Sequence, residues 1–348
     1  TIQGPNLHDD SVLVLDGMGG SYAGLEIRAD NCAIKKLTIA NFGGYGISVR
    51  PPTGELVTGA LLTGTTIGNR MPLGIIDKPN GGVIKLQDTG SSVIGGDTAA
   101  DRNVIAGNTG NGIYILDSAT NLVKGNYIGV KADGVTALPN STGVYVSNST
   151  GNTIGGNTAG SRNVISGNTS NGVYVVGNEN VVMGNYIGTD ISGTVAIPNG
   201  NIGVRIGNGG AAVSSGNIIG GSAAGQGNLI SGNGSYGIQA VVSDLTTIQG
   251  NTIGLDITKT AALPNNYGIS LSSALNNFIG GTVAGAGNVI SGNTRQGIFV
   301  AENCVNTSIR GNFIGVNGAG EAFGNGMDRI MVQYASDTHI RGLAASYA

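Results

Sequence analysis

The segment NTIGGNTAGSRNVISGN, residues 152–168, contains two short signatures that recur along most of the chain. The first is Ile-Gly-Gly, which begins at Ile94, Ile154, Ile219 and Ile279. The second is Asn-[Val/Leu]-Ile-[Ala/Ser]-Gly-Asn, which begins nine residues after each of those isoleucines and advances in the same steps of 60, 65 and 60 residues. A third, Gly-Asn-[Tyr/Thr/Phe]-Ile-Gly, begins at Gly125, Gly184, Gly250 and Gly311. Repeats of this period are typical of a solenoid, in this chain with four units across residues 91–336.

Each unit divides into two halves of about thirty residues, and each half contains an apolar-polar-apolar triplet after a glycine. Val173-Tyr174-Val175 is an example, and with weaker copies the triplet occurs about eleven times. Period-two alternation over a few residues, bounded by glycine and asparagine, is typical of a short half-buried strand. No segment shows a convincing helical period, so we expect almost no helix.

These strands predict an all-β fold, a single parallel β-helix with three short strands per coil. Each strand would pair with its copy one coil on, about 4.8 Å away, so that about eleven coils form a rod of roughly 50 Å. A closed prism of sheets buries its own core, which explains how a chain with 64 glycines and no tryptophan folds. We expect one domain over 1–348, with irregular coils over 1–90, two-coil repeats over 91–336 and a partial coil over 337–348.

The first asparagine of the second signature and the asparagine of the third fall at one place in successive coils. They are Asn103, Asn126, Asn163, Asn185, Asn228, Asn251, Asn288 and Asn312. We expect them to stack at one corner, because asparagine tolerates the left-handed conformation of a tight turn and its amide can bond to the next copy. Their predicted role is structural.

Three strings resemble the right-handed parallel β-helix repeats of the pectin-lyase-like superfamily. They are Asn-Val-Ile-Ser-Gly-Asn at 163–168, Gly-Asn-Tyr-Ile-Gly-Thr-Asp at 184–190 and Asn-Thr-Ile-Gly-Gly at 152–156. The resemblance covers nearly the whole chain and is closest to repeat regions of large secreted or cell-surface bacterial proteins. It implies a right-handed helix and an extracellular or cell-surface location. It does not choose a function, because this fold carries lyases, glycosidases, esterases, epimerases, phage spikes and adhesins.

Composition argues against several classes of partner and site. The net charge is −3 and no basic stripe exists, so we expect no nucleic-acid partner. No apolar run approaches about 18 residues, so we expect no membrane insertion. With two cysteines and two histidines, zinc sites and serine triads are not supported, and we predict no metal and no cofactor. Cys32 and Cys304 follow equivalent triplets nine coils apart and are expected to be free thiols.

We predict no catalytic residues. The histidine- and aspartate-containing motifs of the enzymes that share this fold are missing, and His8 and His339 lie at opposite ends of the chain. Asp190 and Asp256 occupy equivalent corners roughly 10 Å apart, close to the separation of the carboxylates in an inverting glycosidase. The same column carries Lys131 and Asn317, and this change of residue type argues against catalysis there.

Charge is unevenly distributed, since residues 1–103 hold 18 of the 37 charged side chains. The least regular stretch carries Arg50, Glu55, Arg70, Asp77, Lys78, Lys85 and Asp88. An active site breaks a repeat because catalysis needs unlike groups to converge. The alternative function is therefore a polysaccharide lyase or glycoside hydrolase with its site around 50–102. The preferred explanation is that terminal coils are atypical because they cap the core.

The middle residues of the triplets point away from the core. In consecutive coils they are Tyr114, Tyr145, Tyr174 and Arg205. Spaced about 4.8 Å apart, they would form an aromatic ladder that ends in a guanidinium, with a cation–π contact. Such a strip either binds a glycan by stacking on its sugar rings or only stabilises the sheet by stacking on itself, and the second explanation is the preferred one. These four are the candidate ligand-binding residues.

The sequence thus favours an extracellular structural or adhesive module that presents loops 131–142, 190–201 and 256–267 on a rigid rod. A glycan or a cell surface is the expected partner. No capping helix is recognised at either end, so we expect flanking domains or end-to-end self-association into a filament. The chain starts with neither an initiator methionine nor a signal peptide, which is typical of a mature or excised piece.

Overall fold

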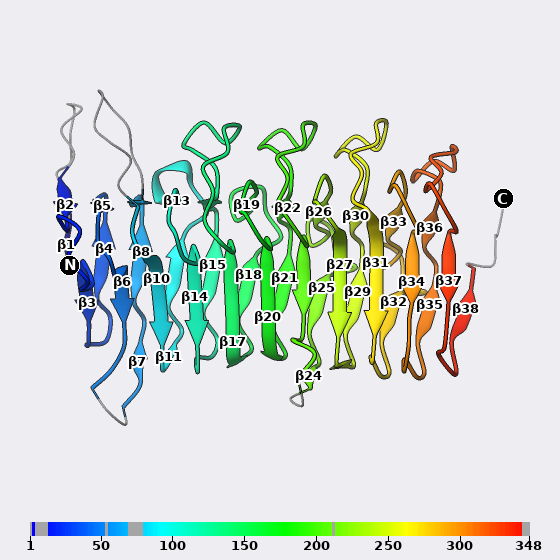
Figure 1. Ribbon diagram of the computed structural model, residues 1–348, viewed down its shortest axis with the longest axis horizontal. Coiled ribbons are helices and arrows are strands. Elements are labelled where there is room, and N and C mark those ends of the chain that lie inside the picture. Colours follow the sequence, from blue (N-terminus) through cyan, green and yellow to red (C-terminus); the bar gives the residue numbers. More distant parts are fainter. Residues whose placement is uncertain (1, 4–12, 53–54, 69–78, 211–212, 343–348) are drawn as a thin grey trace.

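The computed structural model describes residues 2–3, 13–52, 55–68, 79–210 and 213–342. Its strands form three long parallel sheets, and each coil of the chain adds a strand to sheet A, then to sheet B, then to sheet C. Figure 1 shows these strands stacked along the long axis of a rod, from β1 at one end to β38 at the other. Sheets of 12, 11 and 11 strands confirm the predicted parallel β-helix of about eleven coils with three strands each.

Within each sheet the strands follow one another along the rod in the order of the chain. Sheet A consists of β1 (Ile2–Gln3), β4 (Ala33–Lys35), β8 (Leu61–Thr63), β12 (Val93–Gly95), β15 (Leu122–Lys124), β18 (Thr153–Gly155), β21 (Val181–Met183), β25 (Ile218–Gly220), β29 (Thr247–Gln249), β32 (Phe278–Gly280), β35 (Ser308–Arg310) and β38 (His339–Arg341). Sheet B consists of β2 (Val14–Asp16), β5 (Thr38–Ala40), β9 (Thr66–Gly68), β13 (Val104–Ala106), β16 (Tyr127–Ile128), β19 (Val164–Ile165), β22 (Tyr186–Ile187), β26 (Leu229–Ile230), β30 (Thr252–Ile253), β33 (Val289–Ile290) and β36 (Phe313–Ile314). Sheet C consists of β3 (Leu25–Ile27), β6 (Tyr45–Val49), β10 (Gly82–Gln87), β14 (Ile113–Leu116), β17 (Val144–Thr150), β20 (Val173–Asn178), β23 (Val204–Ile206), β27 (Tyr236–Val241), β31 (Tyr267–Ser272), β34 (Ile298–Val300) and β37 (Ile330–Val332).

Little else is regular in the described residues. Two short pairs, β7 (Val57–Thr58) with β11 (Thr89–Gly90) and β24 (Ser214–Ser215) with β28 (Ser243–Asp244), lie beside sheet C. A 3-10 turn, η1 (Ala99–Asp101), is the one helical element found there, in line with the expected near absence of helix. Within the same residues no helix has the length and apolar character needed to cross a bilayer.

The core is a set of in-register apolar columns inside the prism. The inward column of sheet B is built from isoleucines at positions 39, 67, 105, 128, 165, 187, 230, 253 and 290, all with no exposed surface. Each fully buried isoleucine contributes about 1.5–3 kcal/mol, and its β-branched side chain suits an extended backbone. Because pairing is in register, the inward and outward faces are fixed along the whole rod.

The predicted asparagine column is confirmed, with one correction. From Asn103 to Asn312, each side-chain amide donates to the amide oxygen of the next copy at 2.8–3.1 Å. None of these asparagines has a positive φ; the glycine before the third-signature asparagine has it instead, as in Gly125 (φ 70°) and Gly184 (φ 68°). The expectation of left-handed asparagines was wrong, because each asparagine leads directly into a strand of sheet B and glycine takes the turn at no steric cost.

Two further ladders, not foreseen from the sequence, line the other corners of the prism. Between sheets B and C the same amide-to-amide bonds join Asn80, Asn108, Asn140, Asn168, Asn199, Asn233, Asn265, Asn293 and Asn325. Between sheets C and A they join Asn121, Asn152, Asn180 and Asn217. The second asparagine of the Asn-Val-Ile-Ser-Gly-Asn block marks the first of these ladders in the sequence.

Long loops leave the rod after β16, β22 and β30 and project from one side (Figure 1). Each is closed by one antiparallel bridge, Val130–Ala137, Thr189–Ala196 or Leu255–Ala262. Neighbouring loops also bond to each other, since the Ile191 amide donates to the Gly134 carbonyl at 3.1 Å and the Ile257 amide to the Gly193 carbonyl at 3.0 Å. The loops therefore form a continuous shelf beside sheet B.

Candidate functional site

The four residues predicted to form an outward ladder are brought together on sheet C. Tyr114, Tyr145, Tyr174 and Arg205 pair with one another in register along β14, β17, β20 and β23. The ring centroids of Tyr114 and Tyr145 lie 5.1 Å apart at 3°, and those of Tyr145 and Tyr174 lie 4.9 Å apart at 22°. The Arg205 guanidinium lies 5.1 Å from the Tyr174 centroid, which is the expected cation–π contact.

Lys85 extends this row at its other end and was not among the predicted site residues. It pairs in register with Tyr114, and its Nζ lies 5.9 Å from the Tyr114 centroid and 5.5 Å from that of Tyr45. The sequence pattern could have identified Lys85, since it is the middle residue of the triplet Ile84-Lys85-Leu86. Burial lowers the pKa of Lys85, and Arg50 adds to this, while Asp117 and Asp88 oppose it.

We call Lys85, Tyr114, Tyr145, Tyr174 and Arg205 the tyrosine row. Its ring faces are covered by their neighbours, so the row presents ring edges and hydroxyls to solvent, with a cation at each end. Burial raises the pKa of Tyr114 and of Tyr174, so both hydroxyls stay protonated at neutral pH. A protonated phenol both donates and accepts hydrogen bonds.

A second aromatic row lies farther along the rod, on the same sheet. Tyr236 and Tyr267 stack with centroids 4.8 Å apart, and Phe299 follows at 6.2 Å from Tyr267. Arg295 lies 5.4 Å from the Tyr267 centroid and donates to its hydroxyl at 2.7 Å. The triplet pattern does not reveal this pair, because Tyr236 and Tyr267 stand two residues before the triplet isoleucine rather than inside the triplet.

The acidic column that resembled a glycosidase pair is structural. Asp190 and Asp256 are 5% and 4% exposed, and each carboxylate accepts two backbone amides of its own loop and a hydroxyl, from Ser192 or Thr258. In the first loop Lys131 stands where Asp190 and Asp256 stand in the next two. There the carboxylate of Asp133, two residues later, accepts the hydrogen bonds from the equivalent loop amides. These carboxylates close the loops.

The pKa directions agree with this role. Burial pushes the pKa of Asp256 upward, but hydrogen bonds from Thr258, Ala261 and Thr260 outweigh it and leave the pKa below its usual value. The Thr136 hydroxyl is the main cause that lowers the pKa of Asp133. A general acid needs the opposite shift, so neither carboxyl is suited to donate a proton at neutral pH.

Of the described charged residues of the alternative site, Arg50 and Asp88 lie near Lys85 on sheet C, and Asp97 and Arg102 lie elsewhere. Arg50 bonds to Glu26 on sheet C, near Lys85, whereas Asp97 pairs with Lys124 at 2.5 Å and Arg102 lies on Tyr127 beside sheet B. Arg70, Asp77 and Lys78 lie outside the described residues. Within the described ranges no group of three histidine, cysteine, aspartate or glutamate side chains is placed to hold a metal ion.

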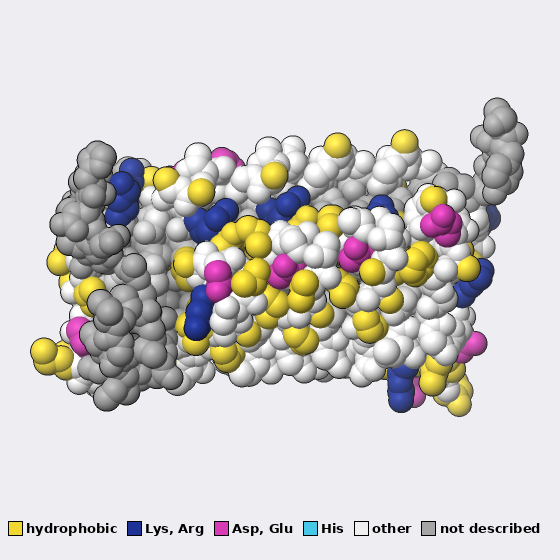
Figure 2. Space-filling view, turned by 90° about the horizontal axis from the view of Figure 1, so that it is seen from above, with side chains coloured by type: hydrophobic (Ala, Val, Ile, Leu, Met, Phe, Trp, Pro, Cys, Tyr) yellow, Lys and Arg dark blue, Asp and Glu magenta, His cyan; other side chains and the backbone are white. Residues whose placement is uncertain are grey.

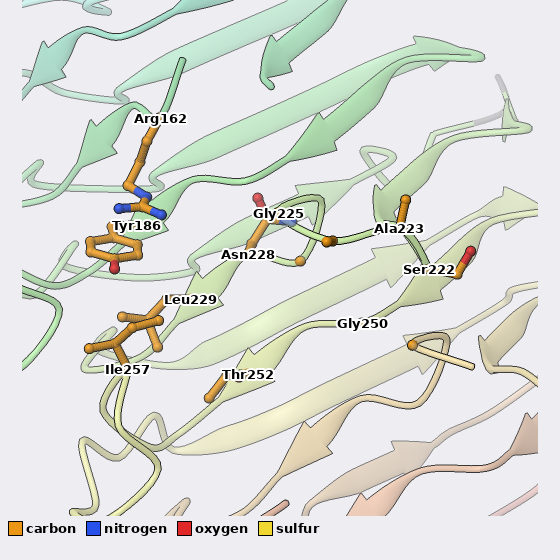
Figure 3. A pocket seen from close by; sticks show the side chains of 14 residues that line it. Arg162, Tyr186, Ser222, Ala223, Gly225, Asn228, Leu229, Gly250, Thr252 and Ile257 are labelled. Atoms are coloured by element: carbon orange, nitrogen blue, oxygen red, sulfur yellow. The ribbon is translucent and has the colours of Figure 1, made fainter. Parts of the chain in front are cut away.

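The face that carries the loops has its own apolar surface. Figure 2 looks onto this face and shows hydrophobic side chains gathered along its middle, with acidic ones at intervals. Below the loops, a small cluster of buried side chains covers the outside of sheet B: Tyr127, Val130, Val164, Tyr186, Ile197 and Leu229. Beside this cluster lies a pocket bordered by Arg162, Tyr186 and Ile257 (Figure 3).

Comparison with known proteins establishes the fold. No family model and no curated protein matches the chain. The A-module of the Azotobacter vinelandii mannuronan C-5 epimerase AlgE6 matches with a TM-score of 0.53 and 15% identity, over 94% of this chain and 86% of that one. The periplasmic alginate epimerase AlgG matches with a TM-score of 0.52 and 14% identity, over 92% and 76%. The Dettilon tailspike protein gives 0.43 and 17%, over 90% of this chain and 61% of the tailspike chain.

At these identities the similarity concerns the fold alone, and this chain spans less than two thirds of the tailspike. Together with the all-parallel sheets, it confirms the right-handed parallel β-helix expected from the repeat strings.

Proposed function

We propose that this chain is an extracellular structural and adhesive module that binds an extended glycan along the outer face of sheet C. The observation that carries the proposal is the in-register tyrosine row. It spans four coil spacings, about 19 Å, and offers one polar group per coil along a straight line. An extended chain of pyranose rings presents its hydroxyls at a repeat comparable to the coil spacing. Successive sugar hydroxyls can therefore each meet one polar group of the tyrosine row.

The proposed mode of binding is not the stacking on sugar rings that the sequence left open as one of two roles for the ladder. Because each tyrosine face is covered by a neighbouring ring or cation, a sugar cannot lie flat on it. The hydroxyls and ring edges are the available contacts. Lys85 and Arg205 add charge-assisted bonds at the two ends for glycans that carry acidic groups.

A scaffold role suits the rest of the rod. Three asparagine ladders and in-register apolar columns hold the strands of sheet C at fixed spacing, so the row is preorganised before the glycan arrives. The carboxylates that could have acted as a catalytic pair are occupied in loop closure. We therefore favour adhesion over polysaccharide cleavage.

The test is a panel of neutral and acidic polysaccharides incubated with the protein. Co-sedimentation measures binding, while new reducing ends and unsaturated products measure cleavage. We expect at least one polysaccharide to be bound and none to be cleaved. Sustained product formation would replace this proposal with the enzymatic alternative, and absence of binding across the panel would overturn it.

The same proposal places the protein outside the cell, with a surface glycan as its partner. Association of copies into a filament, or attachment to flanking domains, completes the adhesive role. Light scattering over a range of concentrations tests the filament: a mass that stays at one chain rules it out.

A further inference from the structure

A pocket of about 330 Å³ opens on the outer face of sheet B. Figure 3 shows Arg162 above the ring of Tyr186 at one end of it, with Leu229 and Ile257 next to them. Thr252 and the loop 221–225, which contains Ser222, are also part of the lining. This pocket lies on a different sheet from the tyrosine row, so it is an independent site.

The pocket exists because the third repeat lacks two side chains that the first two repeats have. Tyr127 and Tyr186 stand in the outward column of sheet B, and Thr252 takes the equivalent place. An arginine lies on each tyrosine, with Arg102 4.2 Å and Arg162 4.1 Å from the ring centroid. Gly227 stands where the third arginine would be, since all three precede a ladder asparagine. A ring and a guanidinium are thus missing, and their space is open.

Arg162 borders this space with unused hydrogen-bonding capacity. Its Nε is buried and has no acceptor among the described residues, whereas Nε of Arg102 donates to the Gly125 carbonyl at 3.2 Å. No carboxylate in the described part of the chain forms an ion pair with Arg162. The buried Nε is closed to a ligand, so an acceptor from outside the chain is expected at the terminal nitrogens of Arg162, to which no described residue bonds.

We infer that the pocket binds a single ring that carries an anionic substituent. The ring occupies the space over Leu229 and Thr252 that a tyrosine fills in the earlier repeats, and the anion accepts hydrogen bonds from Arg162. The volume suits one ring rather than a long chain. The Ser222 and Thr252 hydroxyls favour a sugar acid as the source of this chemistry, and an aromatic carboxylate is the other source.

Calorimetric titration with glucuronate, glucose and benzoate tests the inference. We expect glucuronate to bind at least ten-fold more tightly than glucose. Arg162→Gln removes the cation and Thr252→Tyr fills the pocket with the side chain used in the equivalent places. Each should weaken glucuronate binding at least ten-fold while the circular dichroism spectrum stays unchanged. Arg102→Gln is the matched control, because it removes the equivalent stacked arginine from Tyr127, and neither residue lines this pocket, so it should leave binding unchanged.

Binding of benzoate in place of glucuronate, with the same loss in both variants, would assign the site to aromatic carboxylates. Absence of binding by all three compounds, or binding that survives Thr252→Tyr, would overturn the inference. Polysaccharide binding by the tyrosine row is measured in the same variants and should be unaffected, so failure of one site is distinguished from failure of the other.

Discussion

Ile165 shows what one inward side chain contributes. It lies in the isoleucine column of sheet B with no exposed surface. Aspartate at this position would place an unpaired carboxylate inside the closed prism. That costs several kcal/mol, a large part of the about 5–15 kcal/mol by which folded domains are stable. We predict that Ile165→Asp does not fold, as measured by loss of the β-sheet circular dichroism signal.

Asp190→Asn is the control for that prediction, because it changes the charge of a buried loop residue instead. A fourth loop follows β36 and is closed by the bridge Val316–Ala322. Asn317 holds the equivalent place in this loop, and its Oδ1 accepts hydrogen bonds from two amides of the loop at 2.9 and 3.0 Å. Asparagine can therefore close the loop, and the melting temperature should change by only a few degrees. Equal destabilisation by Ile165→Asp and Asp190→Asn would show that the inward and outward faces are wrongly assigned.

The two cysteines test the coil count at residue scale. Both are free thiols, and they follow the first and the tenth strands of sheet C, β3 and β34, nine coils and roughly 40 Å apart. Cys304 is fully buried, and burial raises the pKa of its thiol, whereas Cys32 is half-buried. A thiol reagent should therefore modify Cys32 in the native protein and Cys304 only after unfolding. Mass spectrometry that finds an intrachain disulfide would contradict the solenoid.

The loops are the elements that should respond to pH. The carboxyls of Asp133 and Asp256 have a lower pKa in the folded protein than in the unfolded chain. The stability they provide is therefore fully present above the unfolded pKa and is lost as pH falls through the folded pKa. The amides of Thr260 and Ala261 donate hydrogen bonds to the Asp256 carboxylate. As the pH falls from 7 to about 3, these two amides should lose protection from hydrogen exchange.

The fourth loop supplies the control for this titration. Its Ala319 amide donates to Asn317, which has no charge to lose in this range. After correction for intrinsic exchange rates, its protection should change less than that of Thr260. Equal loss in both loops would assign the effect to general acid destabilisation instead.

At the scale of the whole molecule, each coil contacts mainly its neighbours, so a unit should be removable. Deletion of residues 219–278 joins Ile218 to Ile279 and keeps the repeat in register, because Ile219 and Ile279 are equivalent inward residues of sheet A. We predict that the shortened chain folds and that small-angle scattering gives a rod shorter by about 10 Å. A misfolded product would show that the two-coil units assigned to 91–336 are not modular.

The sequence predicted the architecture well because spacing alone determines which residues stack in a solenoid. The stacking of Tyr114, Tyr145, Tyr174 and Arg205, the first asparagine ladder and the free cysteines all follow from counting coils. What it could not predict depends on contacts across the rod. Closure of the loops by Asp190 requires knowing where its own backbone amides point, and the pocket beside Arg162 results from two absences, at Gly227 and Thr252, that no motif marks.

Glycan binding through the hydroxyls of sheet C is tested most directly by combining Tyr114→Phe, Tyr145→Phe and Tyr174→Phe. Phenylalanine keeps the stacked rings and removes three hydroxyls, each hydrogen bond being worth about 1 kcal/mol. The melting temperature should stay within a few degrees, while affinity for the bound polysaccharide falls at least ten-fold. The control, Tyr236→Phe with Tyr267→Phe on the second aromatic row, should bind like the original chain. Unchanged affinity in the triple variant would contradict the proposed mode of binding and leave the tyrosine row with a purely structural role.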